Sequence, residues 1–485
     1  MTFLAINWPA VGLQAGYLIF SLSILVIVHE FGHYITAKWF KCRVEKFYLF
    51  FDPWFSIFKK KIGETEYGVG WLPLGGYVKI AGMVDESMDK EQLALPPQPW
   101  EFRSKPAWQR LIIMLAGVTM NVLLAFFIYA MILYTWGETK LPMANVKDGI
   151  WVTDSLLHDI GLRNGDKIES VNGEPVKYFN DLPAKILLGK EIVLERDGKQ
   201  QTLTIPVNMI ERLVERKRDR RPLVQPRLPI IIGGFSTSEE SKSSLPKSVS
   251  LDTRATNMSG GEVAVNTNQN RKNLKEFDKI IAVDSTPVNY FDEMAPILKE
   301  KRGDSVALTL VRNGATVEAK VLVDTSGTIG FYVINDLQAD SMGILKQETK
   351  QYTLLESFPA GVVKTGEQLS FYVQQFKMIL NPKTGAYKGL GGFKTMASIF
   401  PDYGWNWEAF WKITAFFSII LAFMNLLPIP ALDGGHVVFT LVEMVTGRKP
   451  SDKFLEYAQI AGMIILFALL IFANGNDWFG WGARH

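Results

Sequence analysis

Four long apolar segments alternate with polar stretches, and each is long enough to cross a lipid bilayer, which takes about 20 helical residues. They cover residues 11–39, 107–136, 410–432 and 455–472. Tryptophans cluster at their ends, as expected at a membrane–water interface: Trp8, Trp108, Trp136, Trp405, Trp407, Trp411, Trp478 and Trp481. The pattern therefore predicts four transmembrane helices, two near each end of the chain.

The first apolar segment is predicted to be a retained span rather than a signal peptide. Residues 1–10 contain no Lys or Arg, and no small-residue cleavage site follows the apolar run. A signal peptide is expected to have both features.

Lys and Arg concentrate in two of the connections between these segments. The connection after the first segment is rich in both, and the loop after the third carries Arg448, Lys449 and Lys453. The positive-inside rule then places these two connections in the cytoplasm. Both termini, and the long region between the second and third segments, are expected outside the cytoplasm.

The long region between the second and third segments contains an internal repeat. Residues 166–180 match residues 278–292, and residues 194–198 match residues 310–314. Residues 194–198 end in Asp-Gly and residues 310–314 end in Asn-Gly. Both dipeptides favour a β-hairpin turn. We therefore expect two small α/β domains, each built as strand, turn, strand, helix and hairpin.

The first repeat resembles a PDZ domain, because Gly161-Leu162 and Gly165-Asp166 precede it. The second copy lacks both glycines in residues 274–278, so whether it binds peptide is open. Between the copies, the basic residues 212–227 and the Ser-rich residues 236–250 are interpreted as a solvated connection. Residues 352–380 are expected to form an amphipathic helix at the outer membrane surface.

The connection after the first segment contains short strand-like runs over residues 66–80, interrupted by Gly and Pro. This pattern predicts a β-hairpin. Its apolar side chains suit a membrane interface or the interior of a helix bundle, although an ordinary surface hairpin fits the pattern equally well. An exposed strand edge could pair with an extended peptide.

A candidate metal-binding motif lies near the end of the first apolar segment: His29-Glu30-Phe31-Gly32-His33. On a helix, His29 and His33 leave the same face one turn apart. The two imidazoles can therefore bind one Zn²⁺, and Glu30 lies beside them to act on a metal-bound water. The chain of 485 residues has five histidines in all, so a chance match is improbable.

Composition narrows the remaining classes of protein. The net charge of +3 is too weak to favour nucleic acid as a partner. Cys42 is the only cysteine, which excludes a disulfide framework and a cysteine-based metal site.

A third zinc ligand is needed, and two acids are candidates. Glu45 is the nearest acid downstream but has basic neighbours, whereas Asp433 lies at the end of the third apolar segment. Because an acid beside a hydrocarbon segment is costly unless it is paired or metal-bound, Asp433 is preferred. Pro428 and Pro430 are expected to break the helix just before it, and an ordinary helix end is the alternative.

These motifs resemble the site-2 protease family of intramembrane zinc metalloproteases, in particular the RseP-type regulators of sigma-E. The resemblance rests on the HEFGH motif, on the pattern from Asn425 to Gly434 and on the paired PDZ-like repeats. It implies a single catalytic Zn²⁺ bound by His29, His33 and Asp433, with Glu30 as general base. Gly117-Val118 departs from the Gly-Pro that the resemblance leads us to expect before Asn121.

The resemblance also implies substrate contacts and a setting. Substrate-binding residues would be Asn425, Pro428, Pro430, Gly68, Gly70 and Gly75. The substrate would be a single-span anti-sigma factor that another protease has already trimmed, and the cleavage would belong to an envelope stress response. The PDZ-like pair would bind peptides or chain termini and act as a size filter. The protein would be a multi-pass component of the bacterial inner membrane, with its active site towards the cytoplasm.

The expected fold is a polytopic α-helical membrane protein with four transmembrane helices, two extracytoplasmic PDZ-like α/β domains and a membrane-associated β-hairpin. The expected order is first helix 1–39, cytoplasmic loop with hairpin 40–106, second helix 107–136, first PDZ-like domain 137–225, second PDZ-like domain 226–335, interfacial helical region 336–408, third helix 409–435, and loop with fourth helix 436–485.

Two other classes of protein remain as alternatives. A non-proteolytic membrane scaffold could present the tandem PDZ domains to partners. A transporter with broken helices usually has repeats among its hydrophobic segments, whereas the repeats of this chain lie in the polar region.

Overall fold

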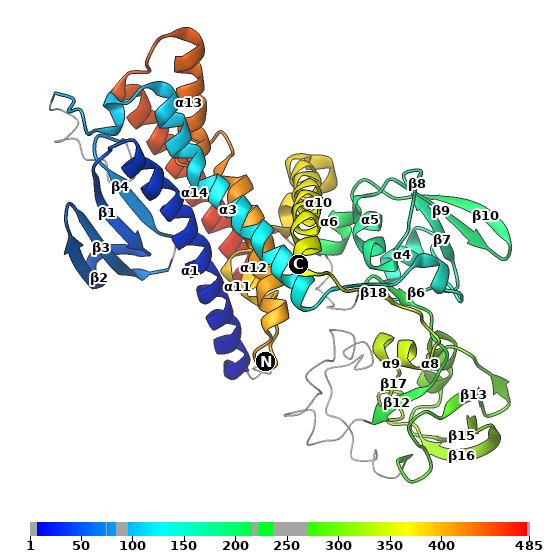
Figure 1. Ribbon diagram of the computed structural model, residues 1–485. Coiled ribbons are helices and arrows are strands. Elements are labelled where there is room, and N and C mark those ends of the chain that lie inside the picture. Colours follow the sequence, from blue (N-terminus) through cyan, green and yellow to red (C-terminus); the bar gives the residue numbers. More distant parts are fainter. Residues whose placement is uncertain (1–6, 74, 84–95, 216–221, 236–269, 483–485) are drawn as a thin grey trace. The chain divides into compact units, whose positions relative to one another are not determined.

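The chain divides into two compact units, of which unit 1 comprises residues 1–138 and 350–485 and unit 2 comprises residues 139–349. The computed structural model describes residues 7–73, 75–83, 96–215, 222–235 and 270–482 (Figure 1). Unit 1 contains the apolar helices, and unit 2 contains the repeated region.

Within the described residues, four helices of unit 1 are long and apolar enough to cross a membrane. They are α1 (Trp8–Trp39), α3 (Ala107–Thr135), α12 (Trp407–Asn425) and α14 (Asp452–Phe479). The prediction of four apolar helices of membrane-spanning length is therefore confirmed. The Asn7 side chain caps the first turn of α1 by accepting a hydrogen bond from the Ala10 N–H, and Pro9 lies in that turn.

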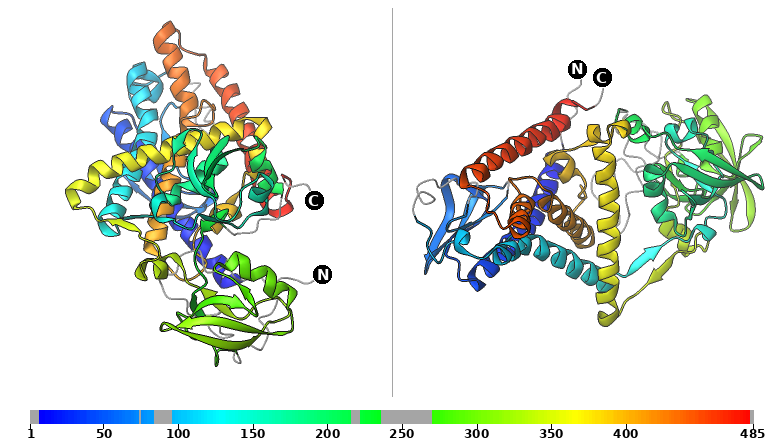
Figure 2. Two further views of the ribbon diagram at one scale, coloured as in Figure 1. Left: turned by 90° about the vertical axis from the view of Figure 1, so that its right-hand side faces the viewer. Right: turned by 90° about the horizontal axis from the view of Figure 1, so that it is seen from above.

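Helix α3 is the centre of unit 1, because α1, α12, α13 (Asp433–Thr446) and α10 (Leu354–Leu380) all pack against it. Helix α10, where the amphipathic helix was predicted, lies across α3 and α12 rather than parallel to them (Figure 2). The short helix α11 (Phe393–Ser398) contacts α1 and α14.

The third span is shorter than predicted. Helix α12 ends at Asn425, and Asp433 is the first residue of the separate helix α13. Pro428 and Pro430 lie in the turn between the two helices. Proline has no N–H to donate and clashes with the preceding helical turn, so the helix cannot run on to Leu432.

The polar connection after α1 folds into a four-stranded sheet, and the predicted hairpin within it is wrong. The strands β1 (Val44–Leu49), β2 (Phe51–Ile62), β3 (Thr65–Leu72) and β4 (Tyr77–Ile80) have the order β2-β3-β1-β4. β3 and β4 do not pair with each other, because β1 lies between them, parallel to β3 and antiparallel to β4. The hairpin is instead β2–β3, which turns at Gly63 with a φ of 63°.

Unit 2 contains the same small sheet twice, which confirms the sequence repeat. The first sheet has the order β10-β9-β7-β8, and the second, read in the same direction, has the order β16-β15-β13-β14. Their strands are β7 (Lys167–Val171), β8 (Glu174–Pro175), β9 (Glu191–Arg196), β10 (Lys199–Thr204), β13 (Lys279–Val283), β14 (Thr286–Pro287), β15 (Ser305–Arg312) and β16 (Ala315–Leu322). Helix α5 (Leu182–Leu188) follows β8, and α8 (Phe291–Glu300) follows β14.

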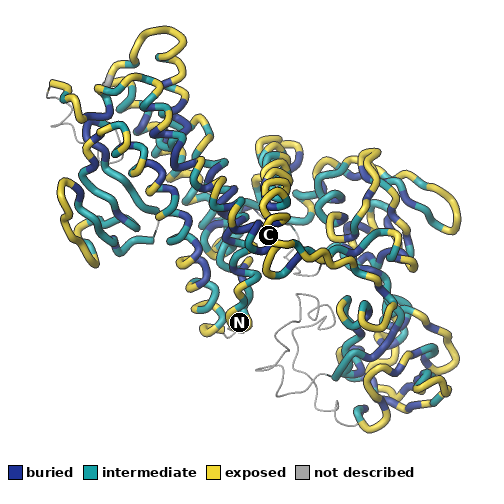
Figure 3. Tube along the Cα trace, in the orientation of Figure 1, coloured by how far each residue is buried: buried dark blue, intermediate teal, exposed yellow. Residues whose placement is uncertain are grey.

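Each of the two sheets contains an ion pair between an arginine and a buried aspartate, at equivalent positions. Arg196 contacts Asp166 at 2.7 Å, and Arg312 contacts Asp278 at 2.6 Å. Each sheet also has its own core, made mostly of Leu, Ile and Val. Buried residues are dark blue along the chain trace in Figure 3. The repeat in the sequence is therefore a repeat of both topology and internal contacts.

The remaining elements of unit 2 are short. β6 (Ile150–Val152) pairs with β11 (Val224–Pro226), β12 (Ile232–Phe235) pairs with β17 (Phe331–Val333), and β5 (Glu138–Lys140) pairs with β18 (Glu348–Lys350). The helices are α4 (Ser155–Asp159), α6 (Met209–Glu215) and α9 (Asp336–Ser341).

Part of the predicted solvated connection is folded. Residues 209–215 form α6. β11 pairs with β6, and its Val224 is buried in the core of the first repeat. The Ser-rich residues 236–250 lie outside the described residues.

Candidate metal centre

Three side chains from two helices of unit 1 converge on one point. His29 and His33 lie one turn apart on α1, and Asp433 is the first residue of α13. The Nε2 atoms of both histidines lie 3.2 Å from Oδ2 of Asp433 and 3.2 Å from each other. The ligand atoms of the three residues all fall within 4.8 Å of one another.

Burial makes this cluster a good fit for a metal ion. His29 is 7% exposed and His33 is 6% exposed. Oδ2 of Asp433 is buried and has no hydrogen-bond partner among the described residues. A buried carboxylate oxygen is costly unless a cation or a donor compensates it. Two imidazole nitrogens and one carboxylate oxygen are the protein ligands of many catalytic zinc sites, so the residues present fit Zn²⁺.

Helix α3 fixes the orientation of both imidazoles. Nδ1 of His33 lies 2.8 Å from the carbonyl oxygen of Ile113, to which it donates as N–H. Its Nε2 then keeps a lone pair for a metal. Nδ1 of His29 lies 3.2 Å from the side-chain amide of Asn121.

The amide of Asn121 can serve His29 in the same way. Its Oδ1 is buried without a hydrogen-bond partner among the described residues, while Nδ2 is the atom placed against His29. Turning the amide over exchanges these two atoms, which are nearly indistinguishable in shape. Oδ1 then accepts the Nδ1–H of His29, and Nε2 of His29 is left unprotonated for a metal.

The space beside the imidazoles depends on Gly117 of α3. A Cβ at this position would lie 2.3 Å from Nε2 of His33 and 2.7 Å from Cε1 of His29. On the facing helix, a Cβ on Gly32 would lie 2.6 Å from the Ala116 carbonyl oxygen. Two glycines therefore permit the close approach of α1 and α3. The neighbouring Val118, where the sequence departs from the expected proline, is buried within an unbroken α3.

Glu30 follows His29 and faces the start of β4. A Cβ on Gly76 would lie 3.4 Å from Cγ of Glu30, and the Glu30 carboxylate faces the backbone N–H of Val78. The Tyr77 hydroxyl ties β4 to β2 by donating to Oδ1 of Asp52 at 2.9 Å. Burial and this hydrogen bond raise the pKa of Tyr77, so the hydroxyl stays protonated and remains a donor.

The structure brings together five of the predicted site residues. Asn425 ends α12, and its Nδ2 lies 3.3 Å from Nε2 of His29, so this side chain joins Glu30 and the three ligands. Pro428 and Pro430 lie in the turn that leads to Asp433.

Gly68 and Gly70 lie in β3, an inner strand that pairs with both β1 and β2. A Cβ on Gly68 would lie 2.4 Å from the Tyr48 ring, and one on Gly70 would lie 2.1 Å from the Phe51 carbonyl oxygen. These two glycines make room for neighbours inside the sheet. Gly75, with a φ of 147°, directly precedes Gly76 and β4. A substrate contact at all three positions stays a prediction.

Sequence reasoning assigned no role to Gly117 or Asn121, although both interrupt an apolar helix. A polar amide inside such a helix is itself a signal of function. The carbonyl of Ile113 and the N–H of Val78 are backbone groups, and their roles depend on the packing of distant elements. No side-chain pattern could have indicated them.

Apolar helices long enough to span a membrane, with a His-His-Asp centre and a glutamate beside it, define a membrane zinc metalloprotease. The sequence pattern of Peptidase family M50 matches residues 17–469, and the chain belongs to this family, the site-2 proteases. The chain is 26% identical to the "Regulator of sigma E protease" of Haemophilus influenzae, over 95% of this chain and 98% of that protein.

Two further relatives carry the name "Putative zinc metalloprotease". The chain is 25% identical to the protein of Thermotoga maritima, over 95% of this chain and 98% of the relative. It is 27% identical to the protein of Vibrio cholerae, over 95% of this chain and 97% of the relative. The chain therefore matches these relatives over nearly their whole length.

Proposed function

We propose that this enzyme cleaves the transmembrane segment of single-span membrane proteins. The observation that carries the proposal is the position of the donor cluster. His29 and His33 lie on a helix that is apolar enough to span a membrane, and Asp433 meets them from a second helix of the same unit. A substrate bond cleaved by these residues would lie within the membrane region rather than in a separate soluble domain.

The side chains around the cluster can perform peptide hydrolysis. Zinc, when it is held by His29, His33 and Asp433, supplies Lewis-acid chemistry. Glu30 accepts a proton from the attacking water and passes it to the leaving amine nitrogen. The Asn425 amide, 3.3 Å from His29, holds the substrate backbone beside the cluster.

The substrate is expected to bind as an added strand at the outer edge of β4. A helix hides its peptide bonds, so the segment that is cleaved must first unwind, and its freed backbone groups then need partners. Among the described residues β4 pairs with β1 alone, and Val78 in β4 and Gly76 just before it face Glu30. Main-chain pairing with this edge would bring an unwound segment past the general base.

The setting we propose is the bacterial inner membrane. The distribution of Lys and Arg supports both termini and unit 2 in the periplasm and the metal centre towards the cytoplasm. The Haemophilus influenzae relative is named for sigma E regulation, which supports a trimmed anti-sigma factor as substrate within an envelope stress response.

Unit 2 is proposed to contain two PDZ-like domains that bind peptides or chain termini and act as a size filter. Gly165 has a φ of 90° directly before Asp166, and Phe277 has a φ of 67° directly before Asp278. The second copy therefore has the same loop conformation as the first even though it lacks the glycine. This likeness supports a common domain type for both repeats.

The test compares the wild type with Glu30→Gln in a reconstituted bilayer that contains a single-span substrate. Glu30→Gln is expected to keep one zinc per chain and to lose at least about 100-fold in cleavage rate, the usual range for removing a general base. His29→Ala is expected to lose zinc and cleavage together. Full cleavage by Glu30→Gln would refute the mechanism, and unchanged cellular function of both variants would favour the scaffold.

A further inference from the structure

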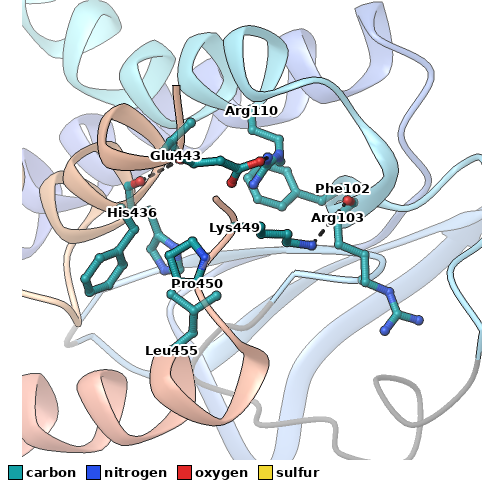
Figure 4. Close-up of a pocket in the computed structure, with 11 residues that line it drawn as sticks. Phe102, Arg103, Arg110, His436, Glu443, Lys449, Pro450 and Leu455 are labelled. Carbon is teal, nitrogen blue, oxygen red and sulfur yellow. Dashed lines mark hydrogen bonds and ion pairs between the residues drawn. The ribbon is translucent and has the colours of Figure 1, made fainter. Parts of the chain in front are cut away.

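An ion pair joins α3 to α13 at some distance from the metal ligands. Arg110 lies in the first turn of α3, and its Nη2 is 2.5 Å from Oε1 of Glu443 on α13. The side chains are 9% and 17% exposed, and Nε of Arg110 also donates to the Lys105 carbonyl oxygen at 3.0 Å. Figure 4 shows the two charged groups facing each other in the wall of a pocket.

The same face of α13 carries this ion pair and the metal ligand. Four residues fall within about 80° of the helix circumference at 100° per residue: Asp433, His436, Thr440 and Glu443. His436, Thr440 and Glu443 all line the pocket with Arg110. Glu443 is ten residues from Asp433, which is about 15 Å along the helix. A contact at Glu443 therefore fixes the rotation of the face on which Asp433 stands.

Helix α3 also holds the other two ligands. The Ile113 carbonyl receives the N–H of His33, and the Asn121 amide lies against His29. Helix α3, which supplies no ligand itself, thus contacts both histidines directly and is joined to α13, which carries Asp433, through Arg110 and Glu443. Along α3, Arg110 contacts Glu443 first. Ile113 then contacts His33, and Asn121 contacts His29.

We infer that Arg110 and Glu443 are positioning residues that set the rotation of α13 so that Asp433 reaches the two histidines. The inference rests on the proposed zinc centre. A rotation of α13 by 20° would move a side-chain atom about 5.5 Å from the helix axis by about 2 Å. Zinc–ligand distances tolerate only about 0.2 Å. A small rotation of α13 after loss of the Glu443 contact would therefore change the distance between Asp433 and the metal by more than the site tolerates.

A purely structural role makes a different prediction. Removal of one partner leaves a buried charge unpaired and destabilises the fold, whereas replacing both by apolar residues of similar volume commonly restores stability. If the pair only fills space, the double variant should regain both stability and metal affinity. If it positions α13, stability should return without the affinity.

The experiment compares four full-length, detergent-solubilised proteins: wild type, Glu443→Gln, the double variant Arg110→Met with Glu443→Met, and Glu138→Gln as matched control. Glu138 pairs with Lys364 at 2.7 Å, far from the ligands in sequence, and its side chain is 21% exposed against 17% for Glu443. The measurements are the zinc dissociation constant against a competing chelator, the absorption spectrum of bound Co²⁺, and the melting temperature of the metal-free protein.

The expected result is zinc binding about tenfold weaker in Glu443→Gln and in the double variant, at the lower end of the effect of residues that orient ligands. The Co²⁺ spectrum should shift in both, the melting temperature should recover in the double variant, and Glu138→Gln should bind zinc as the wild type does. Wild-type affinity and spectrum in the double variant would overturn the inference. A wild type that binds no zinc would instead refute the zinc centre itself.

Discussion

Replacing Gly117 by alanine should remove zinc from the enzyme. The new methyl group would lie 2.3 Å from Nε2 of His33, whereas ordinary van der Waals contact begins at 3.4 Å. The imidazole, the helix or both must therefore give way by about 1.1 Å. That shift is about five times the tolerance of a zinc–ligand distance. We expect zinc affinity to fall at least about 100-fold, which corresponds to about 2.8 kcal/mol.

The assay is the zinc content of purified protein after dialysis against a chelator of graded strength, followed by cleavage of a reconstituted substrate. Gly16→Ala on α1 is the matched control, because a Cβ there meets no heavy atom of the described chain within 4 Å, the helix's own nearby backbone aside. Alanine favours a helix over glycine by up to about 1 kcal/mol, so propensity alone predicts that both variants gain stability. Wild-type zinc content and cleavage in Gly117→Ala would refute the steric reasoning.

Two further predictions concern unit 2. Phe277→Gly should stabilise the second repeat by about 1 kcal/mol, because a left-handed backbone is strained for phenylalanine and the side chain is 54% exposed. Amide hydrogen exchange in β13 should therefore slow about fivefold. Unchanged or faster exchange would contradict this prediction. Burial raises the pKa of Asp278, but hydrogen bonds from Arg312 and the Lys275 N–H outweigh it and lower the pKa below 3.8. This carboxylate therefore stabilises the fold at pH values above its unfolded pKa, and the contribution is lost as the pH falls through the folded value. Asp278→Asn should flatten that acid-dependent part of the stability, whereas an unchanged acid profile would exclude Asp278 as its source.

Local chemistry made the helices and the histidine pair predictable. An uncharged apolar run of bilayer length folds as a helix because only a helix satisfies its own backbone in such surroundings. Once α1 is a helix, the spacing of His29 and His33 places them on one face without any tertiary contact. The repeat in unit 2 was visible for a similar reason, since each copy encodes its own turns and strands.

Strand pairing was not predictable in the same way. The runs that form β3 and β4 were recognised, but β1 enters the sheet between them. A period of two residues determines which side chains share a face and says nothing about which strand is the neighbour. As a result, the glycines of β3 lie inside the sheet, and β4 is the edge strand of the described sheet beside Glu30.

The sequence by itself determined that this protein has four apolar helices, a histidine pair with a glutamate beside it, and a duplicated α/β region. These properties depend on residues close together in the chain. Only the tertiary structure decided that Asp433 starts a new helix, that Gly117 leaves room for the imidazoles, and that α3 contacts both histidines. These relations join residues up to about 400 positions apart, and they arise from the packing of α1 and α13 on α3, which no local pattern encodes.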